Sequence, residues 1–321
     1  MIRVAINGYG NLGRGVELAI SKCADMECVA VFTRRDPQTL TTLGAPAVPL
    51  ADVEKWRGKI DVVINCGGSA TDLIDQGPQI AQWFSCVDSF DTHAKIPQHF
   101  SAMDEVARQA GTLALISSGW DPGLFSMIRV LADAVLPGGT ATTFWGPGVS
   151  QGHSDAIRRI EGVQDAKQYT VPIDAAVETV KSGGSVNVPR QMHTRECFVV
   201  AEDGADRDAI TQAIVTMPNY FADYDTTVTF VTPEEFARDH SGMPHGGKVI
   251  HVGSTSEHRH SVVFDLQLDS NPEFTGSVLV ASARAVARMA GRGNTGAITM
   301  MDVTLGDLSP RDNSELRAHF L

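Results

Sequence analysis

The stretch IRVAINGYGNLG, residues 2–13, decides the fold class of this chain of 321 residues. It begins with a short apolar run, Ile2–Asn7, that is typical of a buried strand, and Leu12–Ala24 then has apolar residues at helical spacing. The glycines between them form the pattern G-x-G-x-x-G, which permits a tight turn and directs helix N–H groups at a pyrophosphate. A glycine turn that binds nothing is the weaker alternative, because strand, loop and helix all fit the dinucleotide-binding motif.

Strand and helix patterns continue to alternate through the first third of the chain. The strand-like runs are Cys28–Thr33, Asp61–Asn65 and Leu113–Ser117, and the helical runs are Asp72–Phe84 and Pro97–Ala110. This alternation indicates βαβ units and a parallel sheet. We therefore predict an α/β protein whose N-terminal part, residues 1–118, is a Rossmann-type dinucleotide-binding domain.

The pattern changes after Ser118 and predicts a second domain of α+β type, residues 119–296. It would hold a helix, a Gly/Pro-rich loop, four longer strands and a last helix, in the order Leu124–Val135, Pro137–Gly152, Gln191–Ala201, Thr226–Val231, Lys248–Gly253, Ser261–Leu268 and Gly276–Ala290. One more strand pattern, Ala297–Val303, follows. The C-terminal segment, about 297–321, is the part that could return to the first domain.

The residues after the second strand favour NADP over NAD. An NAD site places an acidic residue there, whereas this chain has Thr33, Arg34 and Arg35, and a guanidinium suits a 2′-phosphate. A solvated basic turn, or Asp36 as a displaced ribose ligand, are the alternatives. Small residues follow the third strand, where Ser69 and Asp72 have the spacing of a capping box. The cofactor-binding residues expected are Gly8, Tyr9, Gly10, Asn11, Leu12, Gly13, Thr33, Arg34, Arg35, Cys66, Gly67, Gly68, Ser69, Ala70 and Thr71.

Composition narrows the possible partners. The chain has 26 basic and 38 acidic side chains, a formal net charge of −12, which disfavours nucleic acid and anionic membranes as partners. Its five cysteines form no C-x-x-C pair, which predicts reduced thiols and no metal site. The chain begins directly with a strand pattern and has no apolar run of about 18 residues, so we expect a cytoplasmic protein.

Two aspartates, Asp91 and Asp121, follow later strands of the first domain. Ligands of open α/β sheets bind beyond the carboxyl ends of the strands, so these side chains could converge near a nicotinamide. Judged singly, each has a structural explanation. Asp121 precedes Pro122 and could cap a helix, and Asp91 could be a turn residue.

Long segments of the chain resemble the meso-diaminopimelate dehydrogenase family. They are GYGNLGRGVE, TRRD, GSATD, SGWDPG, FWGPGVSQGHSDA, MPHGG and LDSNPEF, which together extend over essentially the whole sequence. The pair Gly67-Gly68 departs from the family pattern, which has a bulkier residue before the second glycine. The resemblance implies a homodimer whose second domain binds substrate and dimerises. The implied activity, in lysine biosynthesis, is reversible NADP-dependent oxidative deamination of the D-centre of meso-2,6-diaminopimelate to L-2-amino-6-oxopimelate and ammonia.

The resemblance also implies roles for individual residues. Asp91 and Asp121 would face the reacting amino group, with Asp121 as the base and His153 as a reserve group that activates water. The remaining substrate-binding residues are Trp120, Trp145 and Gln151-Gly152-His153 near the reacting carboxylate, Thr170, Arg195 and His245 at the distal carboxylate, and Asn271 at the distal amine. Each has a structural alternative: a structural histidine for His153 and His245, a core residue for Trp145, a surface charge for Arg195 and a turn for Asn271.

Two other classes of protein could share this sequence pattern: another two-domain NADP-dependent dehydrogenase and a non-catalytic NADP-binding sensor. A semialdehyde dehydrogenase needs a cysteine nucleophile, and none stands in an obvious catalytic loop; a homoserine-type dehydrogenase shares the two-domain plan. A non-catalytic NADP sensor would need no ordered polar cluster in the second domain. Arg284, Arg288 and Arg292 recur at helical spacing, and a solvated helix face explains them better than an anion site.

Overall fold

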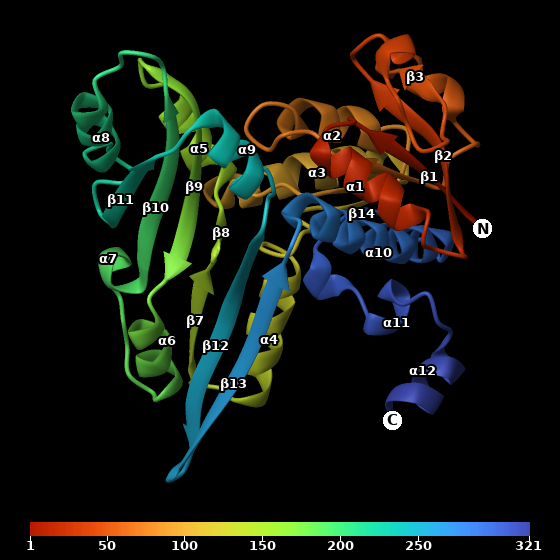
Figure 1. The fold of residues 1–321 in the computed structure, drawn as a ribbon. Helices are drawn as coiled ribbons and strands as arrows, with labels where there is room; N and C mark the ends of the chain where they lie inside the picture. Colours follow the sequence, from red (N-terminus) through yellow and green to blue (C-terminus); the bar gives the residue numbers. More distant parts are fainter. The chain divides into compact units, whose positions relative to one another are not determined.

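The computed structural model describes residues 1–321, which form two compact units. The first unit comprises Met1–Met127 and Pro272–Leu321, and the second is Ile128–Asn271 (Figure 1). These bounds differ from the expected ones, because residues 119–127 and 272–296 belong to the first unit. No helix combines the length and the apolar character needed to cross a membrane.

The first unit contains a seven-stranded sheet in the order β14-β6-β5-β4-β1-β2-β3, with every neighbouring pair parallel. Its strands are β1 (Ile2–Asn7), β2 (Met26–Thr33), β3 (Ala47–Pro49), β4 (Val62–Asn65), β5 (Cys86–Asp88), β6 (Leu113–Leu115) and β14 (Gly296–Ile298). Its helices are α1 (Asn11–Ile20), α2 (Leu73–Ala81), α3 (Ile96–Ala110), α11 (Leu305–Leu308) and α12 (Asn313–Phe320), with the start of α4 (Leu124–Val135) and most of α10 (Asn271–Gly291). The predicted α/β class is confirmed.

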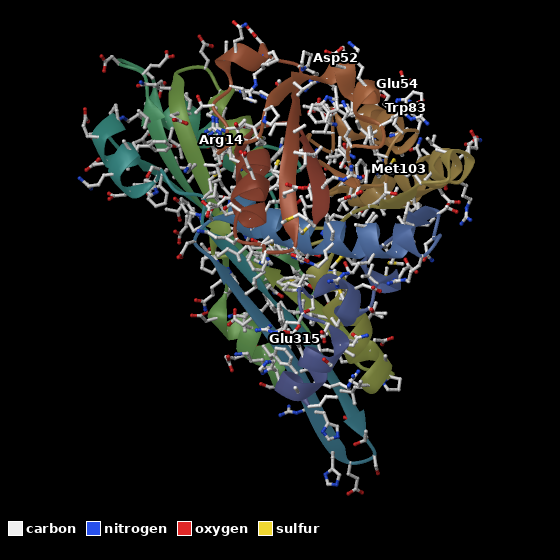
Figure 2. The ribbon with its side chains drawn as sticks, turned by 90° about the vertical axis from the view of Figure 1, so that its right-hand side faces the viewer. Arg14, Asp52, Glu54, Trp83, Met103 and Glu315 are labelled. Carbon is white, nitrogen blue, oxygen red and sulfur yellow. The ribbon has the colours of Figure 1, made fainter.

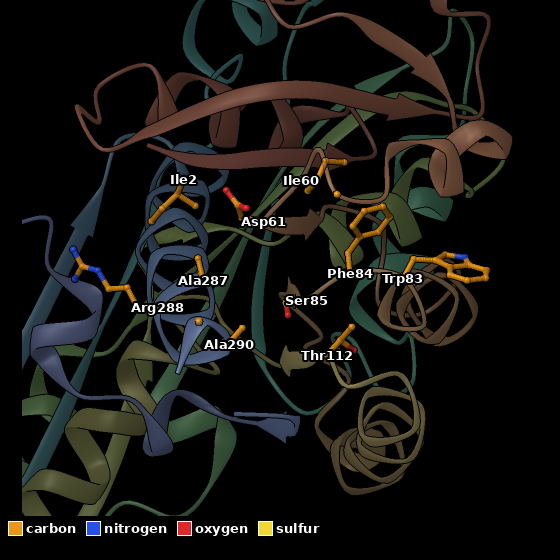
Figure 3. A pocket seen from close by; sticks show the side chains of 12 residues that line it. Ile2, Ile60, Asp61, Trp83, Phe84, Ser85, Thr112, Ala287, Arg288 and Ala290 are labelled. Carbon is orange, nitrogen blue, oxygen red and sulfur yellow. The ribbon is translucent and has the colours of Figure 1, made fainter. Parts of the chain in front are cut away.

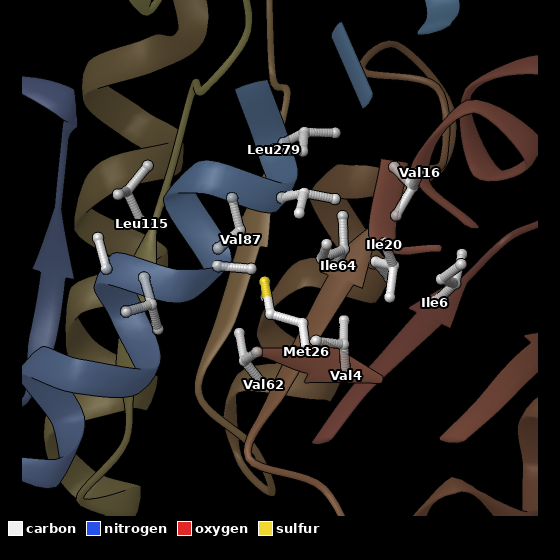
Figure 4. Packing of buried hydrophobic residues seen from close by; sticks show 14 of the residues in the cluster. Val4, Ile6, Val16, Ile20, Met26, Val62, Ile64, Val87, Leu115 and Leu279 are labelled. Carbon is white, nitrogen blue, oxygen red and sulfur yellow. The ribbon is translucent and has the colours of Figure 1, made fainter. Parts of the chain in front are cut away.

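The sheet of the first unit is buried on both faces, as parallel strands require. On one face Val4 and Ile6 of β1 pack with residues of α1 and α10, among them Leu279 (Figure 4). On the other face Ala5 packs with residues of α2 and α3, including the fully buried Met103. Figure 2 shows Met103 within this unit and Glu54 at its outer rim. Helix α10 thus supplies a layer of the first core, which explains why it belongs to that unit.

Arg284 and Arg288 of α10, with Arg292 just after its end, do not form the solvated face expected from their spacing. Arg284 is only 3% exposed and pairs with Asp25, with Nε–Oδ2 and Nη2–Oδ1 distances of 2.6 and 3.0 Å. Arg288 donates to the carbonyl oxygens of Gly306, Asp307 and Ser309, and Arg292 forms an ion pair with Asp307. These contacts attach the C-terminal segment to α10.

The second unit contains two sheets, one in the order β11-β10-β9-β8 and one in the order β13-β12-β7. Its strands are β7 (Thr140–Trp145), β8 (Gly148–Val149), β9 (Val163–Pro172), β10 (His193–Ala201), β11 (Asp225–Phe230), β12 (His245–Thr255) and β13 (His258–Leu268). Its helices, besides the end of α4, are α5 (Gln151–Arg158), α6 (Asp174–Lys181), α7 (Pro189–Met192), α8 (Arg207–Val215) and α9 (Pro233–Asp239).

Two sequence expectations for the strands are wrong. The stretch Pro137–Gly152 is not a loop, because it holds β7, β8 and the start of α5. Its glycines serve close packing: Gly146 has φ +99°, and a Cβ atom there would lie 2.0 Å from the Thr170 carbonyl oxygen. Strand β9, the longest strand of the four-stranded sheet, was not predicted. In the first unit, Ala297–Val303 forms only the end of the short β14, followed by a 3-10 helix.

Candidate functional site

The glycine loop has the backbone geometry of a pyrophosphate site. The Gly8 N–H donates to the Phe32 carbonyl oxygen at 3.0 Å, which ties the loop to the end of β2. A Cβ atom at Gly13 would lie 2.2 Å from the Gly8 carbonyl oxygen, so only glycine fits there. The space that a Cβ of Gly10 would enter is open, and α1 begins directly after Gly10. A phosphate can therefore approach the backbone at the positive end of a helix dipole.

Arg34 and Arg35 lie at the rim of this loop. The Arg35 guanidinium donates to the Tyr9 carbonyl oxygen at 2.5 Å, and the side chain of Arg34, 66% exposed, pairs with Asp72 at 2.8 Å. Both guanidiniums thus lie beside the glycine loop or the start of α2, at the same edge of the sheet. The carboxylate of Asp36 accepts from the Gln38 N–H, so it caps a short 3-10 helix. That contact weakens the alternative of a ribose ligand.

The loop after β4 packs closely for a reason that the sequence did not reveal. Asp72 Oδ2 accepts from the Gly68 N–H at 3.1 Å, and a Cβ at Gly67 would lie 2.7 Å from the Asp72 Cβ. This contact accounts for the unusual Gly67-Gly68 pair. Ser69 does not form the expected capping box, since α2 begins at Leu73 and its N-cap position is Asp72. Its hydroxyl accepts from the Asp91 N–H at 3.0 Å instead.

Asp91 and Asp121 follow two adjacent strands. Strands β5 and β6 run parallel, with Val87 opposite Leu115, so the turns after them lie at the same edge of the sheet. Asp91 is exposed and Asp121 is half-buried. Since α4 begins at Leu124, Asp121 is not at the N-cap position of that helix. Trp120, which precedes it, is buried and packs edge-on against Phe125, with ring centroids 5.2 Å apart.

A cavity at the opposite edge of this sheet has none of these features. It encloses about 450 Å³ and is lined by Ile2, the first residue of β1, and by Asp61, Ser85 and Thr112, which each precede a strand (Figure 3). Its polar groups already have partners: Asp61 pairs with Arg3, Ser85 accepts from a backbone N–H, and Thr112 donates to a carbonyl oxygen. The chemistry of the first unit is therefore concentrated at the carboxyl edge of the sheet.

In the second unit, Arg195 is a buried cation without a counter-charge. It is 7% exposed, its Nη1 donates to the Thr170 hydroxyl, and its guanidinium lies 3.9 Å from the centroid of the Tyr224 ring. Its Nε–H has no hydrogen-bond partner, and the groups that act on its charge are Tyr224 and Cys197, with no carboxylate among them. Burial lowers the pKa of Arg195. A buried guanidinium in this state is stabilised by an anion that enters from outside.

Two histidines near Arg195 are held neutral. Burial and then the charge of Arg195 lower the pKa of both His153 and His193 to about 4. His153 Nδ1 lies 2.7 Å from the Ser150 hydroxyl, and His193 Nε2 accepts from the Trp145 N–H at 3.0 Å. Trp145 itself is 41% exposed and is not a core residue. His193 was missed from the sequence, because a histidine at the start of a strand gives no signal of its own.

The remaining predicted residues of this unit, His245, Gln151 and Asn271, are the first residues of β12, α5 and α10. His245 begins β12, is half-buried, and its Nδ1 accepts from the Gly246 N–H at 2.8 Å; burial lowers its pKa. The amide of Gln151 donates to Met243 Sδ at 3.3 Å, and the N–H of Asn271 donates to the Met243 carbonyl oxygen at 2.9 Å. Asn271 is also the first residue of α10 and not merely a turn residue. The loop at Met243 therefore connects Gln151 and Asn271.

The glycine loop of the first unit was also incompletely described by its motif. The carboxylate of Glu17, 3% exposed, accepts from the Tyr9 hydroxyl and from the N–H groups of Leu43 and Ala45. Burial, with the hydrogen bond to Glu17, raises the pKa of Tyr9. Glu17 thus fixes both Tyr9 and the loop after Arg35. Its helical position reads as an ordinary surface glutamate in the sequence.

A parallel sheet with a glycine loop and a basic pair beyond β2, joined to a second unit with a buried unpaired arginine, defines a nicotinamide-dinucleotide dehydrogenase that acts on an anionic substrate. Residues 119–270 match the model of the diaminopimelic acid dehydrogenase C-terminal domain. The meso-diaminopimelate D-dehydrogenase of Lysinibacillus sphaericus is 57% identical, over 100% of this chain and 99% of the relative. The chain belongs to the meso-diaminopimelate D-dehydrogenase family.

Solved structures agree with this assignment. A sixfold mutant of the Clostridium tetani enzyme with DAP is 49% identical, has a TM-score of 0.94 and is matched over 100% of both chains. An engineered D-amino acid dehydrogenase bound to NADP⁺ is 47% identical with a TM-score of 0.87, over 100% of this chain and 99% of that structure. The fold class expected from the sequence, and the resemblance stated there, are both confirmed.

Proposed function

We propose that the residues described above carry out the oxidative deamination of the D-centre of meso-diaminopimelate, giving L-2-amino-6-oxopimelate and ammonia. As a member of the family, the chain is an oxidoreductase of CH–NH₂ groups that uses NADP. The observation that carries the residue-level proposal is the buried Arg195, which has no carboxylate partner. A second carboxylate distinguishes this substrate from simple D-amino acids and would supply that partner.

The first unit would hold NADP. The open space at Gly10 admits the pyrophosphate, and Arg34 and Arg35 would exchange their contacts with Asp72 and the Tyr9 carbonyl oxygen for the 2′-phosphate. The loop Cys66–Thr71 would lie against the cofactor through its small residues. When bound, the nicotinamide accepts a hydride from the substrate carbon. The protein supplies position and charge.

The second unit would bind the end of the substrate that does not react. Thr170, Arg195 and His245 would hold the distal carboxylate and Asn271 the distal amine. The substituted residues of the Clostridium tetani structure are, in order, a glutamine, a threonine, an arginine, a proline, a histidine and an asparagine. This chain has the same residue types in the same order at Gln151, Thr170, Arg195, Pro244, His245 and Asn271. That correspondence supports the assignment.

The reacting end would be served by Asp91 and Asp121, with Trp120, Trp145 and the backbone of Gln151–His153 around the nearby carboxylate. The ammonium group must lose a proton before the hydrogen on Cα can leave as hydride, with both electrons of its bond. Asp121 is the proposed base, and Asp91 would position the nitrogen. Water then adds to the carbon–nitrogen double bond and ammonia departs. His153 is the reserve group for this water; burial lowers its pKa to about 4, which leaves it neutral at pH 7 but a weak base.

The proposal is tested by NADP reduction with the three stereoisomers of diaminopimelate. We expect rapid turnover with the meso isomer, slower turnover with the D,D isomer, whose distal centre has the wrong hand, and none with the L,L isomer. Equal rates for the meso and D,D isomers would contradict the distal clamp. NADPH binding without turnover of any isomer would contradict the proposed dehydrogenase activity.

The semialdehyde dehydrogenase alternative is disfavoured by the cysteines. Burial raises the pKa of Cys28 and of Cys197 to about 12, and it also raises the pKa of Cys66 and Cys86. A thiol nucleophile needs a lowered pKa. Cys23, just beyond the end of α1, donates to the Ala19 carbonyl oxygen of that helix and accepts from Arg284 Nη2 at 3.3 Å.

A homodimer and a cytoplasmic location are further parts of the proposal. In the second unit β13 is an edge strand, and Val262 and Val263 on it are 39% and 44% exposed. Val130, Leu131 and Val135 of α4 are exposed in the same unit. An edge strand and apolar side chains suit pairing with a second copy. Light scattering after gel filtration would test the homodimer, with a monomer mass as the contradicting result.

The five unpaired cysteines support the proposed cytoplasmic location, because free thiols are typical of a reducing compartment.

A further inference from the structure

Asp88 is a fully buried carboxylate at the carboxyl edge of the first sheet. It is the last residue of β5 and is 1% exposed. Its Oδ1 accepts from the N–H groups of Phe90 at 3.0 Å and Ser117 at 2.9 Å, and its Oδ2 lies 2.8 Å from His99 Nε2. Since a carboxylate accepts, the His99 ring donates from this nitrogen. Both oxygens are thus engaged, and each contact fixes a different part of the chain.

These contacts join the ends of two strands beyond their last ladder pair. The pairing of β5 with β6 ends at Val87 and Leu115. Past that point, Asp88 accepts the Ser117 N–H with its side chain and the Ser118 N–H with its carbonyl oxygen, the latter at 2.8 Å. Ser117 has φ +54°, a left-handed conformation that is strained for a serine. The carboxylate therefore holds a turn that the serine would not adopt by preference.

The other turn is held by His99 and Asp88 together. The Phe90 N–H donates to Asp88, and the Phe90 ring stacks on the His99 ring with centroids 4.2 Å apart and an interplanar angle of 15°. Phe90 directly precedes Asp91. Ser118 lies three residues before Asp121. One buried carboxylate therefore fixes the two turns that carry both aspartates.

We propose that Asp88, held by His99, is a positioning residue for the reaction: it sets the register of the turns that present Asp91 and Asp121 to the reacting nitrogen. This inference rests on the proposed function, because it needs those two aspartates at the amino group. Asp88 touches neither the substrate nor the cofactor in this role. Proton transfer depends steeply on placement, since a displacement of about 1 Å can cost on the order of a hundredfold in rate.

The experiment compares Asp88→Asn with Asp25→Asn, steady-state kinetics being measured on the full-length protein with meso-diaminopimelate and NADP. Asp25 is the matched control, because it lies in the same unit, pairs with the buried Arg284 and precedes β2 at the other edge of the sheet. We expect Asp88→Asn to lower kcat by about ten- to a hundredfold and to leave the KM for NADP within about twofold of wild type. Asp25→Asn should lower the Tm and leave kcat unchanged.

Two changes at His99 separate positioning from packing. His99→Phe keeps a ring against Phe90 but removes the donor to Asp88, whereas His99→Gln keeps a donor and loses the ring. We expect His99→Phe to lower kcat as Asp88→Asn does. His99→Gln should keep most of the wild-type kcat, because it retains a donor to Asp88. If Asp88→Asn does not fold, the pair at His99 decides the question alone.

Folded Asp88→Asn and His99→Phe variants with wild-type kcat would overturn the inference. It would also fail if His99→Gln lost as much activity as His99→Phe, because packing of the ring would then be the cause. The proposed function fails by a different result, namely no turnover of meso-diaminopimelate by the wild-type protein.

Discussion

The two units each contain a buried arginine, and the two differ in what surrounds them. Arg284 of the first unit is bound by the carboxylate of Asp25 through two nitrogens. Burial opposes its charge, but the hydrogen bond and charge of Asp25 outweigh burial and raise its pKa. Arg195 of the second unit has only a hydroxyl and an aromatic face, and burial lowers its pKa. The counter-charge of Arg284 is thus part of the fold, whereas for Arg195 the proposed distal carboxylate of the substrate would supply it.

The largest expected effect comes from Arg195→Met. Hydrogen bonds to a charged group contribute about 1.5–3 kcal/mol each, so loss of the guanidinium should lower kcat/KM for meso-diaminopimelate by on the order of a hundredfold or more. D-Alanine, which has no distal carboxylate, should be affected little. The measurement is the ratio of the two kcat/KM values before and after substitution, with the exposed Arg190→Met as control. An unchanged ratio would remove Arg195 from the distal clamp.

Arg284→Met should have the opposite signature. It leaves the Asp25 carboxylate with only the longer contact to Arg288 at 4.0 Å, and Asp25 is about 30% exposed, so we expect a loss of about 2–3 kcal/mol in unfolding free energy, below the value for a fully buried partner. Activity per folded molecule should not change. Urea unfolding together with kcat measures both quantities. A variant that keeps its stability but loses kcat would break the distinction between the two arginines.

Arg34 and Arg35 are an intermediate case, because they are exposed and already have contacts that a phosphate would replace. Changing both to glutamine should weaken NADP binding by about ten- to a hundredfold and NAD binding by less than about twofold. Calorimetric titration with both dinucleotides tests this. Arg57→Gln, whose guanidinium lies over the Trp83 ring in the same unit, is the control for lost charge. Equal loss for NADP and NAD would remove the pair from the 2′-phosphate site.

The smallest expected effect is on the pH dependence of stability. His153 and His193 have a folded pKa of about 4, below the ordinary value of 6.5, so the folded state binds fewer protons. Their contribution to stability is complete above pH 6.5 and is lost as the pH falls toward 4. Arg195→Met removes one cause of the shift, so both pKa values should rise while burial keeps them below 6.5. Imidazole NMR titration measures this, and Arg284→Met should leave both values unchanged. Histidine pKa values that do not respond to Arg195→Met would contradict the electrostatic contact.

The difference between the two arginines could not be predicted from the sequence. Arg284 and Arg288 stand at the spacing of a helix face, which reads as solvated, and the partner Asp25 lies 259 residues away from Arg284. Local pattern carries no information about such a pair. Arg195 lies in a strand that was predicted, but only the structure shows that its face of the sheet is covered. The conformation of the glycine loop could be predicted because its residues are contiguous and the constraint acts on the backbone.

Some residues of the candidate site could be predicted from the local sequence pattern, and others could not. The positions of Asp91 and Asp121 after strands followed from the alternation of strands and helices. The buried groups that organise them, such as Asp88 and His99, were not found, because a buried polar residue looks like an exposed one in the sequence. The strands within Pro137–Gly152 were missed since glycine and proline there serve close packing, as at Gly146. Strand β9 was missed because polar side chains such as Asp165, Lys167 and Gln168 interrupt its apolar pattern.

The discontinuity of the first unit has a consequence for synthesis. A ribosome completes residues 128–271 before it makes most of α10 and all of β14, which finish the first unit. Until then one face of the sheet, including Val4, Ile6 and Val62, lacks α10, one of the helices that cover it. The nascent chain therefore exposes apolar strands for the time needed to translate the whole second unit. We expect ribosome-associated chaperones to bind arrested chains that end near residue 271 more strongly than the complete chain. Equal chaperone binding by the two chains in a ribosome pull-down would refute the exposure of these strands during synthesis.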